Sequence, residues 1–510
     1  MPEQSDETCT SDQDVVVPCV KDAGDLTRNG VIWRLVIFAI LLAFAIKPIW
    51  WSPGGDAVIY LDVAQSLWQT GQLEAFGSKA IFNQVGVAFF FAPAFAFADR
   101  PFLMLSVMQW AAAVGIMILC YRWLRKELNR DHSMLMTWLI LLNTSFWIYY
   151  LRFLSETWCC VLLFTLALMY QELVNAIKQG RYRSAWLWCI ASLPVMVWAA
   201  LTRNICTFMV GGLAVVLLRL YWQQRMGRIL LHGMAMVLLV SLVGGVTAGG
   251  WLLYQQKQTD ATSQVSESYL EFAERALSEN AQQSRSVVKV VTDSIHRRTT
   301  TLGRAVVPGM FRTYPEDGQW LHPLTFVNVI VTILAICGFL RLARSSLDVY
   351  VWMTPFYVVL LLVLPYGAGT RLLLPVMPVV WLSLYELFKE RSWQKNAIMV
   401  LLVLHLIITV GRVVSMYPHE LQRHQEWPII DTLAQSVDQI DPQRQATWAY
   451  LGMDSDYVSM LSFSRNRLIV PFNPESQAQY IVVVGDTQRP QNYQWIQSVE
   501  NYHLLELKTQ

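Results

Sequence analysis

The chain has 510 residues, of which 54% are hydrophobic and 15% are charged. Soluble domains usually carry about 25% charged residues, so this composition excludes an ordinary soluble protein. The net charge of +2 is too small to indicate a nucleic-acid partner, and we expect none. Apolar runs of about 17–25 residues, long enough to cross a bilayer, recur along most of the chain. The composition therefore predicts a protein that crosses a lipid bilayer many times.

The apolar runs predict about eleven transmembrane helices. Residues 1–28 are polar and rich in Asp and Glu, without the pattern of a cleavable signal peptide, so we expect the first helix to remain as an anchor. The predicted helices span residues 31–50, 102–121, 134–150, 157–175, 185–201, 205–221, 229–253, 322–340, 349–365, 372–388 and 396–413.

Lys and Arg residues in the short loops predict the orientation of these helices. If the N-terminus is cytoplasmic, alternate crossing places every basic cluster on the cytoplasmic side. The predicted parts are a cytoplasmic tail (1–30), a transmembrane domain (31–413) with outer loops 51–101 and 254–321, and an extracytoplasmic domain (414–510). The five clusters are Arg122, Arg125, Lys126 and Arg130; Lys178, Arg181 and Arg183; Arg219, Arg225 and Arg228; Arg341 and Arg344; and Lys389, Arg391 and Lys395.

The outer loops contain shorter elements. Apolar and aromatic residues between Asp56 and Gly71 recur at helical spacing, which predicts a helix lying in the membrane interface. Residues 85–97 are apolar but too few to span, and we interpret them as re-entrant or interfacial. The loop 254–321 is polar, with helical character around 266–278 and 284–298.

The C-terminal segment is typical of a small α/β unit. It reads as a helix over 428–440, a strand over 445–451 and a buried strand over 480–484. The predicted fold class is therefore an all-α polytopic membrane protein with a small C-terminal extracytoplasmic α/β domain. There is no internal repeat, and the two similar halves of many transporters are not evident.

Asp56 follows the first apolar helix, and two interpretations fit it. It could cap the next helix, or it could act as a general base whose pKa is raised by the low dielectric of the interface. Asp62 lies six residues later, off the face of Asp56, and we expect it to be solvated or a capping residue.

Arg152, Ser155 and Glu156 lie at a predicted outer turn. Ser and Glu are common at helix starts, and Arg152 could extend to lipid headgroups. The alternative is a second acidic group with an arginine partner, which would orient an acceptor or an ion.

Arg203 and Arg371 each lie alone in an otherwise apolar outer turn. Guanidinium groups bind phosphate through paired hydrogen bonds and stay charged. The glycines beside Arg371 would let the backbone approach a phosphate closely. Contact with lipid headgroups is the other interpretation, and we favour phosphate recognition.

No metal or cofactor motif is present in the sequence. The eight histidines lack metal-ligand spacing, and no phosphate-binding or dinucleotide-binding motif appears. A divalent ion held by Asp56 and Glu156 stays open as an alternative without support from spacing. The cysteines lie in the N-terminal tail or in and beside apolar helices, so we expect no disulfide framework.

Several motifs together resemble the GT-C class of membrane glycosyltransferases, particularly the branch of protein O-mannosyltransferases and aminoarabinose transferases. The resemblance covers roughly residues 30–415 and depends on the order and common membrane side of four short motifs. They are Gly55-Asp56-Ala57-Val58-Ile59-Tyr60, Phe153-Leu154-Ser155-Glu156, Leu201-Thr202-Arg203, and Thr370-Arg371-Leu372-Leu373-Leu374-Pro375-Val376-Met377-Pro378.

The resemblance implies transfer of a hexose or pentose from a polyprenyl-phosphate donor to a glycan, lipid or protein acceptor, outside the plasma (inner) membrane. Asp56 matches the acidic residue that would act as base, and Arg371 matches a position expected to hold the lipid phosphate. Glu156 matches as an acceptor-positioning group, and Arg203 and Arg152 as groups on the phosphate side. The chain departs from many members because Ala57, rather than a second acid, follows Asp56.

Two other function classes fit the pattern. A transporter or flippase for a lipid-linked glycan would use the same arginines but would need no base in the first outer loop. A membrane scaffold would bind a partner through its outer domain and would need no shared cavity for Asp56 and Arg371.

Overall fold

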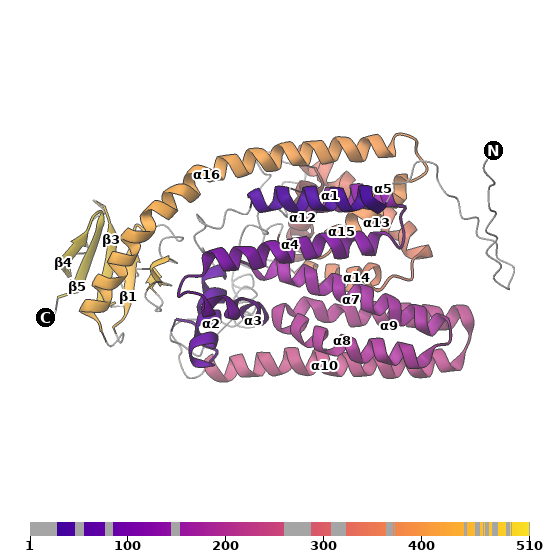
Figure 1. Cartoon of the computed structure of the whole chain (residues 1–510), viewed down its shortest axis with the longest axis horizontal. Helices are drawn as coiled ribbons and strands as arrows, with labels where there is room; N and C mark the ends of the chain where they lie inside the picture. The colour runs from indigo at the N-terminus through magenta and orange to yellow at the C-terminus, as the bar shows by residue number, and fades with distance from the viewer. Residues whose placement is uncertain are drawn as a thin grey trace.

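A computed structural model describes most of the chain, and Figure 1 shows its arrangement. The described residues are 28–45, 56–76, 85–143, 153–259, 287–307, 323–363, 371, 373–442, 446–453, 460–462, 464, 469–471, 478–485, 490 and 492–508. Arg152, the tail 1–27 and the predicted helical stretch 266–278 lie outside them, as does the side chain of Asp56.

Each of the eleven predicted apolar segments overlaps a helix of the bundle. Among the described residues, seven segments of these helices are long and apolar enough to span a membrane: 102–124, 155–178, 182–202, 204–224, 227–257, 325–345 and 394–411. The chain is therefore a multi-pass membrane protein. The bundle comprises α1 (Arg28–Ala45), α4 (Phe102–Leu124), α5 (Arg130–Leu141), α7 (Ser155–Lys178), α8 (Tyr182–Thr202), η2 (Asn204–Phe208), α9 (Met209–Gln224), α10 (Gly227–Thr259), α13 (Pro323–Ser345), α14 (Val349–Val363), α15 (Met377–Phe388) and α16 (Gln394–Ile440).

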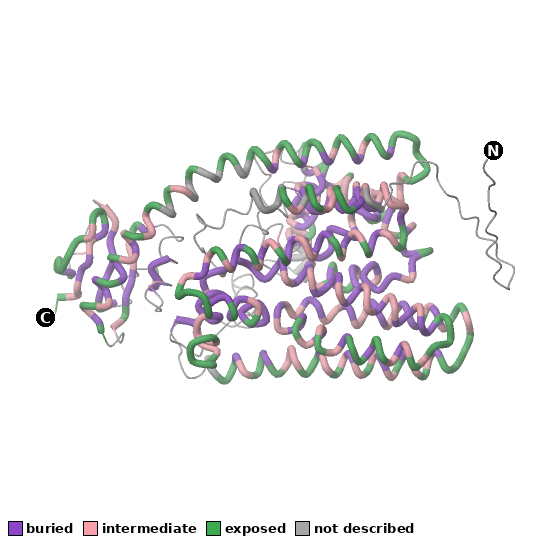
Figure 2. The backbone as a smooth tube through the Cα atoms, in the orientation of Figure 1, coloured by how far each residue is buried: buried purple, intermediate pink, exposed green. Residues whose placement is uncertain are grey.

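The bundle core gathers around α7, which packs against α4 and α8. Trp123, Phe164 and Tyr350 from three helices meet there and are fully buried, with the Tyr350 ring edge to face with the other two. Asp348 accepts a hydrogen bond from the Trp123 indole at 2.9 Å and caps the first turn of α14. Figure 2 shows the buried residues concentrated inside the bundle, whereas α10 and α16 expose outward faces rich in apolar side chains.

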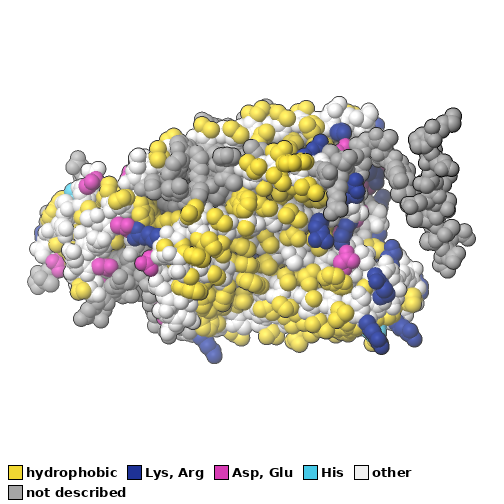
Figure 3. Space-filling model, in the orientation of Figure 1, with side chains coloured by type: hydrophobic (Ala, Val, Ile, Leu, Met, Phe, Trp, Pro, Cys, Tyr) yellow, Lys and Arg dark blue, Asp and Glu magenta, His cyan; other side chains and the backbone are white. Residues whose placement is uncertain are grey.

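The basic side chains lie mainly at one end of the bundle. In Figure 3 most of the Lys and Arg side chains on this face gather at its right-hand end, beyond a broad hydrophobic band. The C-terminal sheet lies at the opposite end in Figure 1. This arrangement agrees with the prediction that all five basic clusters lie on the same side of the membrane.

The described part of the predicted first outer loop folds into a small apolar cluster. It contains α2 (Asp56–Thr70), α3 (Gly86–Phe91) and η1 (Ala92–Ala96). The predicted helix after Asp56 is thus confirmed, and the apolar stretch that we expected not to span forms two short helices. Buried side chains of α2, α3 and η1 pack with Phe153, Leu154 and Trp251, and we call this group the outer-loop cluster.

A polar helix, α12 (Val287–Val306), packs inside the bundle against α13 and α14. Its sequence predicts only a helical part of a polar outer loop. In the structure His296 and Arg298 are buried, and the Arg298 side chain donates to the Leu361 carbonyl at 3.1 Å. Asn143 donates to the Ala305 carbonyl at 2.5 Å. These hydrogen bonds to neighbouring helices therefore compensate part of the cost of burying this polar segment.

The C-terminal segment forms an α/β unit, as the sequence predicts. The end of α16 packs on a five-stranded sheet of order β2-β1-β3-β5-β4, with parallel pairs β1–β2 and β1–β3 and antiparallel pairs β3–β5 and β4–β5. We call this part the C-terminal unit. Helix α16 runs without a break across residue 414, where the predicted extracytoplasmic domain begins. The strands are β1 (Trp448–Leu451), β2 (Val470–Pro471), β3 (Tyr480–Val484), β4 (Tyr493–Val499) and β5 (Tyr502–Leu507).

Gly212 in α9 lies where α14 passes very close, and it provides a test of the bundle packing. A Cβ atom at Gly212 would lie 2.3 Å from the Val349 carbonyl oxygen and 2.8 Å from Met353 N. Because these are backbone atoms, Gly212→Ala must push the helices apart, and we expect a loss of about 1–3 kcal/mol of stability. The measurement is the midpoint of thermal unfolding in detergent.

Gly249→Ala in α10 is the matched control. None of the described residues places an atom within 4 Å of its Cβ position, and Ala favours a helix over Gly. Its midpoint should equal or exceed that of the unsubstituted protein. Equal midpoints for the two variants would contradict the close approach of α9 and α14.

Candidate functional site

Glu156 is a buried carboxylate at the start of α7. Leu154 is extended, and Ser155 and Glu156 form the first helical turn, where a carboxylate also faces the positive end of the helix dipole. The Glu156 side chain is only 2% exposed. The other end of α7, Lys178, belongs to a basic cluster, so Glu156 lies at the opposite end of the bundle. A buried carboxylate at such a place needs a positive partner.

Arg203 provides one such partner. It ends α8 in an extended backbone conformation, which turns the chain into η2. Its Nη2 atom donates to Glu156 Oε1 in a short ion pair, and its Nε donates to Ser155 Oγ at 3.0 Å. The first turn of α7 is thereby tied to the end of α8.

Arg371 provides the second partner. Its Nε atom lies 3.7 Å from Glu156 Oε1, and its side chain is 30% exposed, compared with 14% for Arg203. Two guanidinium groups thus contact one carboxylate. Glu156 Oε2 is buried and has no hydrogen-bond partner among the described residues. Of the two guanidinium groups, that of Arg371 is the more accessible.

Helix α2 contacts the same group of side chains. Tyr60 donates from its hydroxyl to Ser155 Oγ at 3.2 Å, and this oxygen also accepts from Arg203. Asp56 is the first residue of α2, one turn before Tyr60. The structure thus brings Glu156, Arg203 and Arg371 together. It also places the backbone of Asp56 one helical turn from Tyr60, which bonds to Ser155 beside Glu156.

Helix α3 is held tightly against the end of α8. The Phe90 ring stacks between Trp158 and Trp198, with centroid distances of 3.8 and 4.1 Å. Trp198 donates from its indole to the Gly86 carbonyl at 2.9 Å. A Cβ at Gly86 would lie 2.4 Å from Thr202 N, so only glycine fits there. These contacts fix the first outer loop beside the turn that carries Arg203.

Asp62 differs from the sequence-based expectation, because it is neither solvated nor a helix cap. It is 2% exposed within the outer-loop cluster and accepts a hydrogen bond from Phe76 N at 2.5 Å. Burial raises its pKa to about 7, partly offset by this N–H group. Phe76 has a φ of 52°, which is costly for a bulky residue, so Asp62 helps to hold a strained turn. The apolar residues on both sides of Asp62 were the signal that it would be buried.

Metal ligands do not gather in the described part of the chain. No three His, Cys, Asp or Glu side chains come together there in a way that could hold an ion. The described cysteines are free thiols, and the Cys159 and Cys206 sulfurs lie 3.5 Å apart.

Comparison with known proteins identifies the fold. No protein-family model and no curated protein matches the sequence, whereas a solved structure of ArnT, a GT-C aminoarabinose transferase, matches the fold. ArnT from Cupriavidus metallidurans bound to undecaprenyl phosphate has a TM-score of 0.52 at 10% identity, over 94% of this chain and 98% of that chain. Its apo form has a TM-score of 0.47 at 11% identity, over the same shares. The chain has a GT-C-like fold.

The GT-C-like fold confirms the architecture that the short motifs predict. At 10% identity the comparison supports the fold alone, so the roles of Asp56, Arg371, Arg203, Glu156 and Arg152 stay predictions. Their test has to come from the chemistry of this chain.

The raised pKa of Asp62 gives a stability test. The ordinary value is 3.8 and the folded value about 7, so folding favours the protonated form. The free energy of unfolding should therefore fall as pH rises from about 4 to about 7, by up to about 4 kcal/mol. Asp62→Asn keeps an acceptor for Phe76 N–H and removes the buried charge. Its thermal midpoint should exceed that of the unsubstituted protein at pH 8, and the difference should vanish near pH 4.

Asp99→Asn is the matched control in the same outer loop, because Asp99 is exposed. It should leave the pH dependence unchanged. An Asp62→Asn variant whose midpoint follows the wild-type pH profile would contradict the raised pKa.

Proposed function

We propose that the chain is a membrane glycosyltransferase that transfers a sugar from a polyprenyl-phosphate donor to an acceptor at the extracytoplasmic face. The observation that carries the proposal is the pairing of Arg203 and Arg371 with one buried carboxylate, Glu156. The exposure of the Arg371 side chain suits a lipid phosphate, because guanidinium groups bind phosphate through paired hydrogen bonds.

The GT-C-like fold supports this proposal. ArnT, which shares the fold, has been crystallised with undecaprenyl phosphate. A polyprenyl-phosphate ligand therefore suits an architecture of this kind. A hydrophobic bundle surface would hold the lipid tail while the arginines hold its phosphate.

In the proposed reaction the acceptor hydroxyl oxygen attacks the anomeric carbon of the donor sugar. The bond from that carbon to the phosphate oxygen breaks, the hydroxyl proton passes to Asp56, and the polyprenyl phosphate leaves. Attack opposite the leaving group inverts the anomeric carbon. Arg371 and Arg203 stabilise the negative charge that grows on the phosphate, with Arg152 on the same side. We assign Glu156 the role of holding the two arginines.

The proposed orientation follows the basic clusters. The tail 1–30 lies in the cytoplasm, the domain 31–413 spans the plasma (inner) membrane, and the domain 414–510 lies outside. The acceptor is then a glycan, lipid or protein that is accessible from the extracytoplasmic side. No metal or cofactor takes part in the proposed steps.

Asp56→Asn should abolish transfer and leave the protein folded and inserted. A general base contributes typically about 10²–10⁴-fold to a rate, and an amide cannot take the proton. The measurement is release of polyprenyl phosphate from a panel of polyprenyl-phosphate sugars, with Asp99→Asn as the control. Full activity in Asp56→Asn would exclude the base role.

The same assay separates an enzyme from a transporter. A flippase moves the intact donor across the bilayer, so movement without released polyprenyl phosphate in the unsubstituted protein would overturn the proposed function.

Arg371→Ala should mainly weaken use of the donor. Losing a charge-assisted hydrogen bond costs about 1.5–3 kcal/mol, which corresponds to a rise of about 10- to 100-fold in the donor KM. Arg341→Ala is the matched control, because Arg341 pairs with Glu390 at the end of α13 that carries a basic cluster. An unchanged donor KM in Arg371→Ala would remove the phosphate assignment.

A further inference from the structure

Trp427 on α16 packs against two hydrophobic clusters at once. One is the outer-loop cluster, and the other is the core of the C-terminal unit, where Ile430, Leu433 and Val437 of α16 face the sheet. The Phe102 ring, at the start of α4, meets the Trp427 ring edge to face at 5.5 Å. Trp427 therefore joins the C-terminal unit to the first outer loop.

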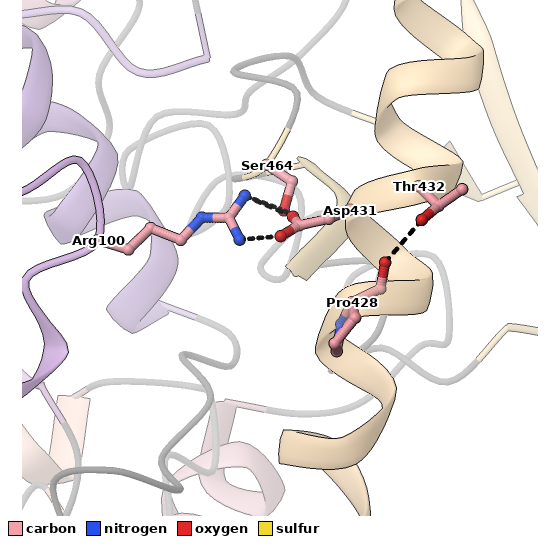
Figure 4. A network of polar contacts seen from close by, with 5 residues as sticks. All are labelled: Arg100, Pro428, Asp431, Thr432 and Ser464. Atoms are coloured by element: carbon pink, nitrogen blue, oxygen red, sulfur yellow. Dashed lines mark hydrogen bonds and ion pairs between the residues drawn. The ribbon is translucent and has the colours of Figure 1, made fainter.

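An ion pair reinforces this contact. Figure 4 shows Arg100, from the end of the first outer loop, pointing toward Asp431 on α16. Both terminal nitrogens of the guanidinium group donate to Asp431, and Ser464 Oγ donates to Asp431 Oδ1 at 2.9 Å. The Arg100 guanidinium carbon also lies 5.0 Å from the centre of the Trp427 ring.

The geometry of this ion pair makes it specific. Paired hydrogen bonds between arginine and a carboxylate fix the orientation of both groups, and the aromatic ring under the guanidinium group adds a cation–π contact. The Arg100 and Asp431 side chains are 32% and 26% exposed. The pair is thus screened less than a fully exposed one.

Arg100 is close in sequence to the elements that hold α2. It follows η1 by four residues, and both η1 and α3 pack on α2. Helix α2 in turn contacts the site through Tyr60 and Ser155. A displacement of Arg100 would therefore be transmitted through close-packed side chains to the helix that begins at Asp56.

We propose that Arg100, Asp431 and Trp427 form a docking joint through which the C-terminal unit positions α2 in the reaction site. They are positioning residues, because they act through α2 and touch no reacting atom. This inference rests on the proposed function for its kinetic part. Its structural part, the restraint of α2 by the joint, holds independently of the reaction.

The test uses the full chain in lipid nanodiscs with Asp431→Asn and Arg100→Lys, which preserve size and the hydrophobic contacts. Hydrogen–deuterium exchange should become faster in α2 and α3 of both variants. At saturating donor and acceptor, kcat should fall about tenfold, because small misplacements of a catalytic group are costly. The donor KM should change less than about twofold, because Arg371 and Arg203 stay in place. Glu390→Gln, which breaks the Arg341 pair, is the control and should change neither readout.

The charge-reversed pair Arg100→Asp with Asp431→Arg supplies a second arm. Each single reversal should speed exchange in α2, and the double variant should restore protection at least in part. Unchanged exchange of α2 in Asp431→Asn, or faster exchange with an unchanged kcat, would overturn the proposal. If the unsubstituted protein releases no polyprenyl phosphate, the proposed function fails, and the exchange arm still decides whether the joint restrains α2.

Discussion

The arrangement of the site depends on the burial of one carboxylate. Glu156 lies out of water at a helix start, where an uncompensated charge would cost several kcal/mol. Arg203 and Arg371 compensate it, and they come from parts of the chain that are 47 and 215 residues away. The ion pairs therefore hold three segments of the bundle at one point.

The first outer loop is attached to this point by neutral contacts. Tyr60 and Arg203 share Ser155 Oγ, while Phe90 is stacked between Trp158 and Trp198. Hydrogen bonds and aromatic stacking are directional and short-ranged. They fix α2 and α3 relative to the arginines without adding charge. The ion pairs thus hold the arginines to Glu156, whereas hydrogen bonds and aromatic stacking hold α2 and α3 beside them.

Hydropathy was sufficient to predict a helix in each of the eleven apolar segments and the buried strand β3, because both depend on long or uninterrupted apolar runs. The alternation of basic and non-basic loops along the chain predicted that Glu156, Arg203 and Arg371 lie on the same side of the membrane. It did not show that they touch, because contacts between distant helices depend on tertiary packing. The sequence did not predict that the polar helix α12 packs inside the bundle, because the groups that accept and donate its hydrogen bonds lie on other helices. Strand β4 was missed because five of its seven residues are exposed and form no alternating pattern.

Helix α16 has 47 residues, so it is about 70 Å long and reaches from the basic end of the bundle to the sheet. Pro418 and Pro428 lie within it, beyond the apolar stretch that ends at Gly411. Each proline removes a backbone donor and weakens the helix locally. Bending of helix α16 is therefore concentrated at these prolines, just beyond its apolar stretch. Asp431 lies beyond both prolines, near the C-terminal end of α16. The ion pair with Arg100 therefore restrains the part of α16 that a bend at the prolines would displace most.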